Sequence, residues 1–548
     1  MLPSSHTTST TSSAGPGIFP TPAFTRAYDY KLPDEPRRDD QVDIDLDVNT
    51  SEFPLSDRNQ IQPAPMPNLH AANIITAPAA EGSPDNKDVF PILDLPPELI
   101  IHIFRCVVQS TPSGLDRDRQ RLWLSWVCGP FRELALGDST LWNLLWFHGL
   151  STARSLAFLD RCGTAPLDVI IKDAEYAPSS SLIMISQLDP ILDALLPKID
   201  QIRMLYVVVR VAEVAERFIS RFSAAGRAAQ LAHYEVRVDN PSHRFFGRPM
   251  GVQVPLSTSS TPQLQHVSLC GVDLDLTKLS AVNLRSINLS YIRSRAFPST
   301  ESWLQILEAA PFLRQLQLEG TGPVPEALSN HRPAHLPSLR MLALSMLSPA
   351  YAIHVISLID APRLMNLSLR DLGDESDFQF IKTLTGRFPE ILLLTLSNLE
   401  LPASDPVALL YAMVRWLETM PRLKMVRFRE MELSLLSAFG AKVQQFWSPE
   451  ESMRYAERER ERSGATTGEL PEPVLLPELQ YVEFLYQRPY DISTVVEWRK
   501  ALGRPIKKVY TYEFNVPFVD PEEVARIKEH CEYEVYGSNS GNPHGRGG

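Results

Sequence analysis

Two histidines, His331 and His335, stand four residues apart, the spacing at which side chains on one helix face can share a metal ion. Pro333 lies between them, and a proline inside a helix removes a backbone hydrogen bond and clashes with the preceding turn. We therefore expect both histidines in a surface loop, and we expect no metal site.

The short motifs that mark common catalytic sites are absent from the sequence. It contains no His-Glu-x-x-His, no Gly-x-x-x-x-Gly-Lys-Ser/Thr, no Gly-x-Gly-x-x-Gly and no Gly-x-Ser-x-Gly. We therefore expect no catalytic residues, no cofactor and a chain that is not an enzyme. The alternative is an enzyme whose cleft no motif reveals.

Five cysteines lie far apart and form no Cys-x-x-Cys pair: Cys106, Cys128, Cys162, Cys270 and Cys531. This usage predicts reduced thiols in an intracellular protein, located in the cytoplasm or the nucleus. The N-terminus lacks the pattern of a secretory leader, and no run approaches the roughly 20 apolar residues of a membrane span. A net charge of −12 over 548 residues gives no reason to expect nucleic-acid binding.

A repeated pattern, Leu-x-x-φ-x-φ with φ apolar, organises the larger part of the chain. Nine copies begin at Ile199, Leu264, Leu284, Leu313, Leu339, Leu364, Ile391, Leu423 and Leu479. Each φ-x-φ predicts a short strand whose alternate residues point inward. Segments such as 302–308 are helical by pattern, and the proline before most strands ends each helix. One such unit cannot cover its own apolar face, so neighbouring units must stack.

The pattern predicts an α/β solenoid with a parallel sheet on its concave face and helices outside. From Leu264 to Leu423 the copies are 20 to 32 residues apart, close to the period of leucine-rich repeats, which the sequence resembles in an irregular form. The asparagine that usually follows the strand in that family is mostly missing. We also expect a first strand at 167–171, a helix over 211–231, a helix at 521–530 and a strand at 533–536.

The stretch from Leu93 to Phe147 predicts a small bundle of three helices. Pro96 and Pro97 suit a helix entrance, and Glu98 favours its positive end. Apolar residues at helical spacing follow on one predicted face: Leu99, Ile100, Ile103, Phe104 and Val107. A charged connection (110–120) leads to a second helix carrying Leu122, Trp126 and Val127, and Gly129-Pro130 separates it from a third. So small a core argues for a partner surface, although a helical cap of the larger domain is an alternative.

The residues of this stretch resemble an F-box of the divergent fungal type. The resemblance lies in Leu95-Pro96-Pro97-Glu98-Leu99, Ile103-Phe104, Val127-Cys128, Phe131-Arg132-Glu133-Leu134-Ala135 and Leu141-Trp142. It implies docking onto an adaptor of the SKP family, which attaches to a cullin–RING ubiquitin ligase. The adaptor-binding residues implied by it are Leu95, Pro96, Pro97, Glu98, Leu99, Ile103, Phe104 and Trp142.

A second candidate surface is the concave face of the predicted sheet, where charged and aromatic residues gather toward the C-terminal repeats. The candidate residues are Glu319, Arg370, Arg427, Arg429, Tyr481 and Glu483. Arginine and tyrosine often carry interface energy, so we expect a protein target there, with an acidic peptide as the natural ligand. A solvated face without a ligand is the alternative.

The order of these parts predicts a disordered tail (1–90), an F-box-like helical domain (91–150), a leucine-rich-repeat solenoid (160–520) with a charged insertion (449–473), and a C-terminal cap and tail (521–548). The resemblance implies a substrate-recognition subunit of an SCF ubiquitin ligase. The alternative is a leucine-rich-repeat scaffold for protein–protein interaction that is not part of a ligase.

Overall fold

The computed structural model describes residues 92–536 with several gaps, of which the longest are 174–181, 240–260, 399–405, 464–472 and 513–519. The predicted N-terminal tail and residues 537–548 lie outside the described residues. All described residues belong to the unit Asp85–Gly548.

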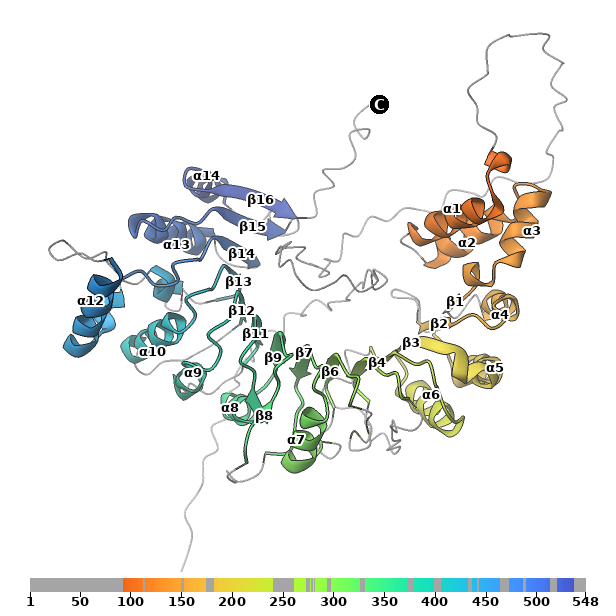
Figure 1. The fold of residues 1–548 in the computed structure, drawn as a ribbon, viewed down its shortest axis with the longest axis horizontal. Helices are drawn as coiled ribbons and strands as arrows, with labels where there is room; N and C mark the ends of the chain where they lie inside the picture. The colour runs from red at the N-terminus through yellow and green to blue at the C-terminus, as the bar shows by residue number, and fades with distance from the viewer. Residues whose placement is uncertain are drawn as a thin grey trace, which may run out of the picture. The chain divides into compact units, whose positions relative to one another are not determined.

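A sheet of fourteen strands runs through the described chain, and each neighbouring pair in it is parallel (Figure 1). In sheet order the strands are β1 (Leu144–Phe147), β2 (Leu167–Lys172), β3 (Ile202–Val209), β4 (His233–Val238), β5 (His266–Cys270), β6 (Ser286–Ser290), β7 (Gln315–Glu319), β9 (Met341–Ser345), β11 (Asn366–Arg370), β12 (Leu393–Ser397), β13 (Met425–Arg429), β14 (Tyr481–Leu485), β15 (Lys508–Tyr512) and β16 (Glu532–Tyr536). The short strands β8 (Ala334–His335) and β10 (Ile359–Asp360) pair separately.

Helices return the chain between strands and lie along one face of this sheet (Figure 1). They are α4 (Thr152–Arg161), α5 (Ile185–Leu195), α6 (Ala212–Ala224), α7 (Thr300–Glu308), α8 (Pro349–Ser357), α9 (Phe378–Leu384), α10 (Pro406–Glu418), α12 (Pro449–Ser463), α13 (Pro489–Ala501) and α14 (Pro521–Lys528). Short 3-10 helices are η1 (Ile92–Asp94), η2 (Ser139–Leu141), η4 (Leu196–Gln201), η7 (Ser437–Gly440) and η8 (Val443–Phe446). We call the other face of the sheet the open face.

Every predicted copy of the repeat from Leu264 to Leu479 forms a strand of this sheet, in the predicted order. In β7, for example, Leu316 and Leu318 are buried under the helices, whereas Gln315, Gln317 and Glu319 keep exposed surface. The prediction of an α/β fold with a long parallel sheet is therefore confirmed, and its alternation is that of a leucine-rich-repeat solenoid.

Two predictions near the start of the sheet are wrong. The register of β3 shifts by one residue after Ile202, so Leu205 and Val207, not Met204, take the inward positions. The helix expected over 211–231 ends at Ala224, because Gly226 adopts a left-handed conformation with φ 112°. The chain then enters β4, which the sequence reading missed.

The sheet contains two further strands, β1 and β15, that the sequence reading also missed. β1 precedes the strand expected at 167–171, which is β2, and it begins within the stretch assigned to the helical domain. β15 lies between β14 and the predicted closing strand, which forms β16. α14 begins at Pro521 as predicted and ends at Lys528, two residues early.

A left-handed residue follows each of seven strands from β5 to β13 and turns the chain toward its helix. These residues are Gly271, Tyr291, Gly320, Met346, Asp371, Asn398 and Glu430, with φ between 46° and 68°. The N–H of Gly320, for example, donates to the carbonyl oxygen of Ser345 on the next strand at 2.9 Å. The next residue is buried in most repeats, as Val272, Leu347 and Leu372 show. The left-handed backbone thus forms the turn after each strand, where leucine-rich repeats usually carry the asparagine that is mostly missing here.

Three helices precede the sheet: α1 (Pro97–Gln109), α2 (Gly114–Leu124) and α3 (Gly129–Gly137). Much of the segment expected as a connection (110–120) is therefore helical, and the second helix ends before Trp126. The rings of Phe104 and Phe131 pack edge to face at 4.9 Å between α1 and α3. We refer to these helices as the helical head.

A buried ion pair joins the helical head to the sheet. The side chains of Asp118 and Arg121 on α2 are both almost fully buried, with Nη1 of Arg121 3.4 Å from Oδ1 of Asp118. The same Nη1 donates to the carbonyl oxygen of Leu144 in β1 at 2.8 Å, and Arg154 of α4 approaches Asp118 at 3.3 Å. Burial lowers the pKa of Arg121 to about 10, a value at which it is still charged near neutral pH.

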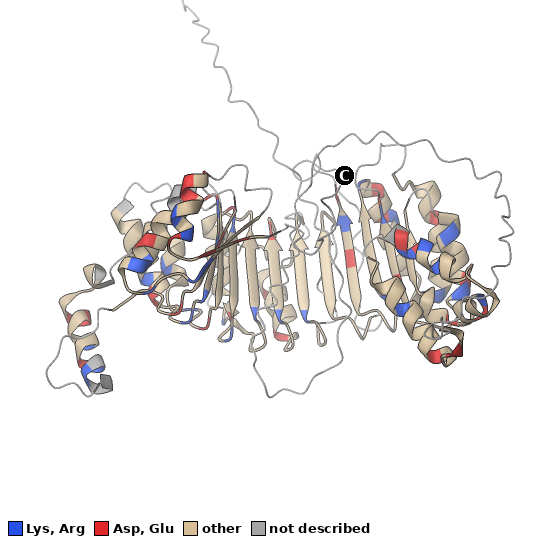
Figure 2. Cartoon of the chain, turned by 90° about the horizontal axis from the view of Figure 1, so that it is seen from above, with Lys and Arg blue, Asp and Glu red and all other residues tan. Residues whose placement is uncertain are grey.

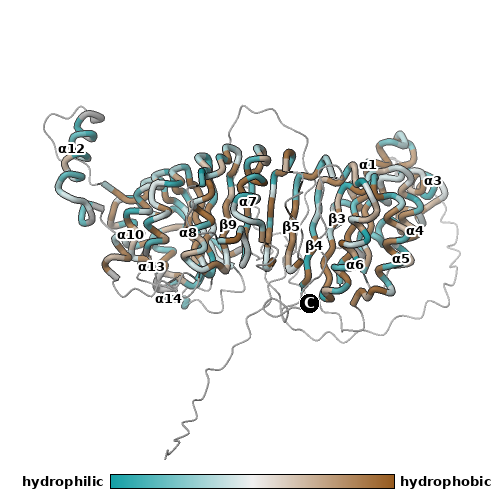
Figure 3. The backbone as a smooth tube through the Cα atoms, turned by 90° about the horizontal axis from the view of Figure 1, so that it is seen from below, coloured by the Kyte–Doolittle hydropathy of each residue, from teal (hydrophilic) through white to brown (hydrophobic). Residues whose placement is uncertain are grey.

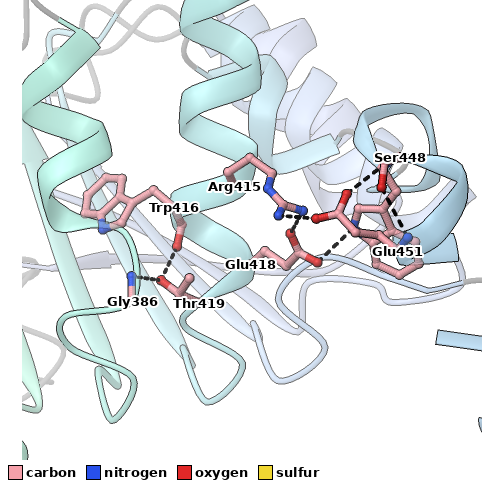
Figure 4. A network of polar contacts seen from close by, with 8 residues as sticks. Gly386, Arg415, Trp416, Glu418, Thr419, Ser448 and Glu451 are labelled. Atoms are coloured by element: carbon pink, nitrogen blue, oxygen red, sulfur yellow. Dashed lines mark hydrogen bonds and ion pairs between the residues drawn. The ribbon is translucent and has the colours of Figure 1, made fainter. Parts of the chain in front are cut away.

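The charged insertion between β13 and β14 is anchored at its start. It forms α12, whose residues are largely hydrophilic (Figure 3). Arg415 of α10 donates to Glu418 at 2.8 Å and to Glu451 of α12 at 2.5 Å, while the indole N–H of Trp447 donates to Glu418 at 2.8 Å (Figure 4). Ser448 caps α12 by accepting from the N–H of Glu451 at 3.2 Å. This network fixes the first turn of α12 to the helix layer.

We expect Gly320→Ala to lower the free energy of unfolding by about 1–2 kcal/mol, because an L side chain is strained in the left-handed region. Its Cβ would meet only ordinary contacts, with the nearest atom of Tyr291 at 3.5 Å, so the cost is conformational. Gly137→Ala is the matched control, since that glycine is helical, exposed and has no atom within 4 Å of an added Cβ. Chemical denaturation of both variants measures the effect, and an equal loss in both would contradict it.

Candidate functional site

The described residues contain no group of three or more His, Cys, Asp or Glu side chains placed to hold a metal ion. His335 lies in β8, not in a loop, and its Nδ1 is 2.7 Å from a carboxylate oxygen of Asp360. The five cysteines form no disulfide, and burial raises the pKa of Cys162 and Cys531 to about 11, so neither is poised as a nucleophile. None of the described helices has the length and apolarity needed to cross a membrane.

The helical head carries a concentration of exposed apolar side chains. Eight of the seventeen large apolar residues that are exposed in the described chain lie between Ile92 and Leu136. On α1, Leu99 is 49% exposed and Ile103, one turn later, is 36% exposed. In the turn between α2 and α3, Trp126 is 66% and Val127 is 64% exposed. We name Leu99, Ile103, Trp126 and Val127 the apolar head surface.

This surface arises because α1 is apolar on both of its faces. Ile100, Phe104 and Val108 recur at helical spacing and are buried in the core. Leu99 and Ile103 precede two of these residues by one position, which rotates them about 100° around the helix axis to its exposed side. Contiguous exposed apolar area is a common feature of interaction sites.

The residues implied as adaptor contacts divide into two groups. Pro96, Pro97, Glu98, Leu99 and Ile103 are exposed, and Leu95 is half-buried. Phe104 and Trp142, in contrast, are buried in the core, so neither side chain is exposed to a partner in this structure. The indole N–H of Trp142 donates to the carbonyl oxygen of Ala135 at 2.8 Å, and its ring packs against Phe158 at 5.0 Å. Both aromatic residues support the head from inside.

A bidentate ion pair holds α1 against the end of the head. Nε and Nη2 of Arg105 each lie 3.0 Å from an oxygen of Asp138, whose side chain also caps η2 through Thr140. Burial alone would raise the pKa of Asp138, but the hydrogen bonds from Arg105 and Thr140 together lower it below its usual range. The carboxylate is therefore charged at neutral pH.

The second candidate surface lies on the open face over β13 to β15. Nε of Arg427 donates to Oε2 of Glu483 at 2.9 Å, and the hydroxyl of Tyr512 donates to Oε1 of Glu483 at 3.0 Å. The rings of Tyr481 and Tyr510 are 6.3 Å apart, and the ammonium of Lys508 lies 5.2 Å from the ring of Tyr510. We name these six residues the arginine–tyrosine face.

Most polar groups of the arginine–tyrosine face are paired within the protein, and one buried donor is not. Glu483 is almost fully buried and both of its oxygens accept hydrogen bonds, so it positions Arg427. Nη2 of Arg427 is buried and has no hydrogen-bond partner among the described residues. Lys508 is also close to the carboxylate of Glu534, whose hydrogen bond raises the pKa of the ammonium.

Only some of the residues that the sequence analysis predicted for this surface lie together in the structure. Arg427, Tyr481 and Glu483 lie on the neighbouring strands β13 and β14, and Arg429 is on β13, 3.8 Å from Glu430. Arg370 is on β11, two strands from β13. Glu319 is on β7, where it accepts hydrogen bonds from the hydroxyls of Ser290 and Tyr291, so it is not part of the same site.

Sequence reasoning missed Lys508, Tyr510 and Tyr512 because it missed β15. The signal is present in Ile506, Val509 and Thr511, which keep the internal spacing of the repeat. Threonine in the final apolar position, and a proline directly before Ile506, obscured the pattern.

No protein-family model matches the sequence, and no curated protein matches it. Solved structures that resemble the fold include a protein from Bacteroides fragilis with a TM-score of 0.26, 10% identity, and coverage of 72% of this chain and 74% of that chain. They also include the leucine-rich repeat-containing protein LegL7 from Legionella pneumophila, with a TM-score of 0.30, 12% identity, and coverage of 55% of this chain and 89% of that chain. These similarities are low, so the functional proposal rests on the two surfaces described above.

We expect Asp138→Asn to lower the free energy of unfolding by about 1–3 kcal/mol at pH 7, because two charge-assisted hydrogen bonds from Arg105 lose their anion. The folded-state pKa of Asp138 is depressed, so its contribution is present above the unfolded pKa of about 3.9 and is lost as the pH falls through the folded value. The difference between wild type and variant should therefore shrink below about pH 4.

Denaturation at several pH values measures this difference. Asp116→Asn is the control, because Asp116 pairs with Arg119 on an exposed helix surface and such pairs contribute little. A difference between wild type and Asp138→Asn that stays constant from neutral pH to below pH 4 would contradict the assigned ionisation.

Proposed function

We propose that this chain is a substrate-recognition subunit of an SCF ubiquitin ligase. The observation that carries the proposal is the exposure of Leu99 and Ile103 on a helix whose sequence resembles the first helix of an F-box. Trp126 and Val127 add exposed apolar area in the turn that precedes α3. In this proposal the apolar head surface docks onto an adaptor of the SKP family, and the adaptor links the chain to the cullin and RING subunits.

The repeats would then hold the target protein. Parallel strands place the same repeat position side by side on the open face, which offers a long surface of adjustable chemistry. The arginine–tyrosine face is the part of it richest in the residue types that dominate interface energies. Ubiquitin transfer would take place on the partner ubiquitin-conjugating enzyme, so the chain itself would need neither a nucleophile nor a cofactor.

Binding of a purified SKP-family adaptor to the full chain tests the proposal. We expect tight binding by the wild type and a loss of at least about a hundredfold in Leu99→Asp/Ile103→Asp, because two apolar anchors would be replaced by charges in a desolvated contact. Isothermal titration calorimetry gives both dissociation constants.

Met184→Asp/Ile185→Asp is the matched control for this experiment. These two residues are 48% and 41% exposed at the start of α5, so the same change of charge occurs away from the head. The control should bind the adaptor as the wild type does. Absence of adaptor binding by a folded wild type would instead favour a repeat scaffold outside any ligase.

A further inference from the structure

Four arginines gather where successive strands begin. Arg285, Arg314 and Arg340 each follow the first leucine of a repeat, and Arg363 precedes the first leucine of the next one. All four are exposed, and none forms an ion pair with a described residue. We name them the arginine edge. Figure 2 shows basic residues at the ends of several middle strands that are otherwise largely uncharged.

Backbone hydrogen bonds place these arginines side by side. The N–H of Arg314 donates to the carbonyl oxygen of Arg285 at 2.8 Å, and the N–H of Arg340 donates to that of Arg314 at 2.8 Å. Neighbouring strands of a sheet are about 4.8 Å apart, so three guanidinium stems start from adjacent rungs at that spacing. Nη1 of Arg340 also donates to the carbonyl oxygen of Arg363 at 3.2 Å, which brings the fourth residue into the same row.

Such a row costs free energy in the isolated chain, because like charges on adjacent strands repel each other. Two other basic residues along the same strand ends are paired within the protein. Arg203 forms a bidentate pair with Asp168, and Arg422 pairs with Glu390. Asp360, the acidic residue that precedes Arg363 most closely, is 2.7 Å from His335 instead. The arginine edge is therefore a stretch of this border whose four arginines form no ion pair with a described residue.

Two exposed apolar residues accompany the arginine edge. Val282 and Phe312 are each 56% exposed and belong to the turns that lead into Arg285 and Arg314. Arginine pairs with carboxylates through two parallel hydrogen bonds, and the apolar side chains offer contact area that a phosphate backbone would not use. The net charge of −12 also opposes a long polyanion. This combination favours a polypeptide with both acidic and apolar residues.

We propose that the arginine edge binds an extended acidic segment of the target protein, lying across the starts of β6, β7, β9 and β11. That the bound segment belongs to a ligase target rests on the proposed function, whereas binding of an acidic segment does not. The edge spans roughly 15 Å, which an extended segment of about five residues can cover. The arginine edge lies across β6 to β11 and the arginine–tyrosine face lies over β13 to β15, so the two surfaces are separated along the strand order of the sheet.

The test uses the full chain and two short fluorescein-labelled peptides. In the first peptide glutamate alternates with leucine, and in the second each leucine is replaced by serine. We expect the first peptide to bind more tightly than the second, and both dissociation constants to rise with salt concentration. In Arg285→Gln/Arg314→Gln/Arg340→Gln, binding of the first peptide should weaken by about tenfold or more, since three surface ion pairs are lost.

Arg454→Gln/Arg458→Gln/Arg460→Gln is the matched control, because it removes the same charge from the exposed surface of α12. Its affinity for the peptide should stay within about twofold of the wild type. Equal weakening in both triple variants, or no peptide binding by the wild type, would overturn the proposal. Binding of a uridine oligonucleotide in place of the peptide, with loss in the first variant alone, would overturn it in favour of RNA.

Adaptor titration of the same samples separates this proposal from the proposed function. The arginine edge is not part of the apolar head surface, so its triple variant should bind the adaptor normally. Adaptor binding without peptide binding would overturn only the proposal that the arginine edge binds an acidic segment. Peptide binding without adaptor binding would support the proposal for the arginine edge and contradict the proposed role in a ubiquitin ligase.

Discussion

A backbone ladder at the start of each strand is the interaction on which the rest of the structure depends. The carbonyl oxygen of one repeat accepts two successive N–H groups of the next, as that of Gln265 does from Arg285 and Ser286, and that of Lys424 from Gln480 and Tyr481. The ladder continues across insertions of very different length and keeps equivalent residues in register. Any repeat position that becomes charged or apolar in several copies is thereby converted into a continuous row. The two surfaces assigned to the sheet, one at the strand starts and one on the open face, are both products of this rule.

The sequence predicts most of the sheet because the spacing of its leucines alone determines which residues face the helices. Where another signal overlapped the spacing, the prediction failed. The apolar helical pattern of α6 masked the repeat that begins at Leu231, and only Gly226 indicates where the helix stops. The one-residue shift in β3 leaves no trace in the pattern, because Met204 and Leu205 are both apolar. Such cases need the geometry of neighbouring strands, which a single segment does not contain.

The helical head shows a different limit. Periodicity shows that α1 is apolar, but it does not show that Ile100 is buried while its neighbour Leu99 is exposed. Contact between Phe104 and Phe131 decides which face is the core, and that contact depends on where α3 returns. Phe104 and Trp142 could be placed in a motif from their types, but their burial could not be read from it. In the same way, the sequence shows an arginine in several repeats, but it does not show that Arg285, Arg314 and Arg340 lie side by side at the starts of neighbouring strands.

The buried pair of Asp118 and Arg121 has a mechanical consequence. It ties α2 to β1, and Trp142 shares its packing with Phe158 of α4, so the head and the first repeat have one hydrophobic core and no linker between them. The head consequently has no hinge of its own at this junction. The distance between a protein docked on the head and one docked on the sheet then depends on the number of strands between them, with neighbouring strands about 4.8 Å apart. In a receptor of the proposed kind, the number of repeats would set the distance between the adaptor and the bound target. Inserting or deleting one repeat would then change which lysines of the target come within reach of ubiquitin.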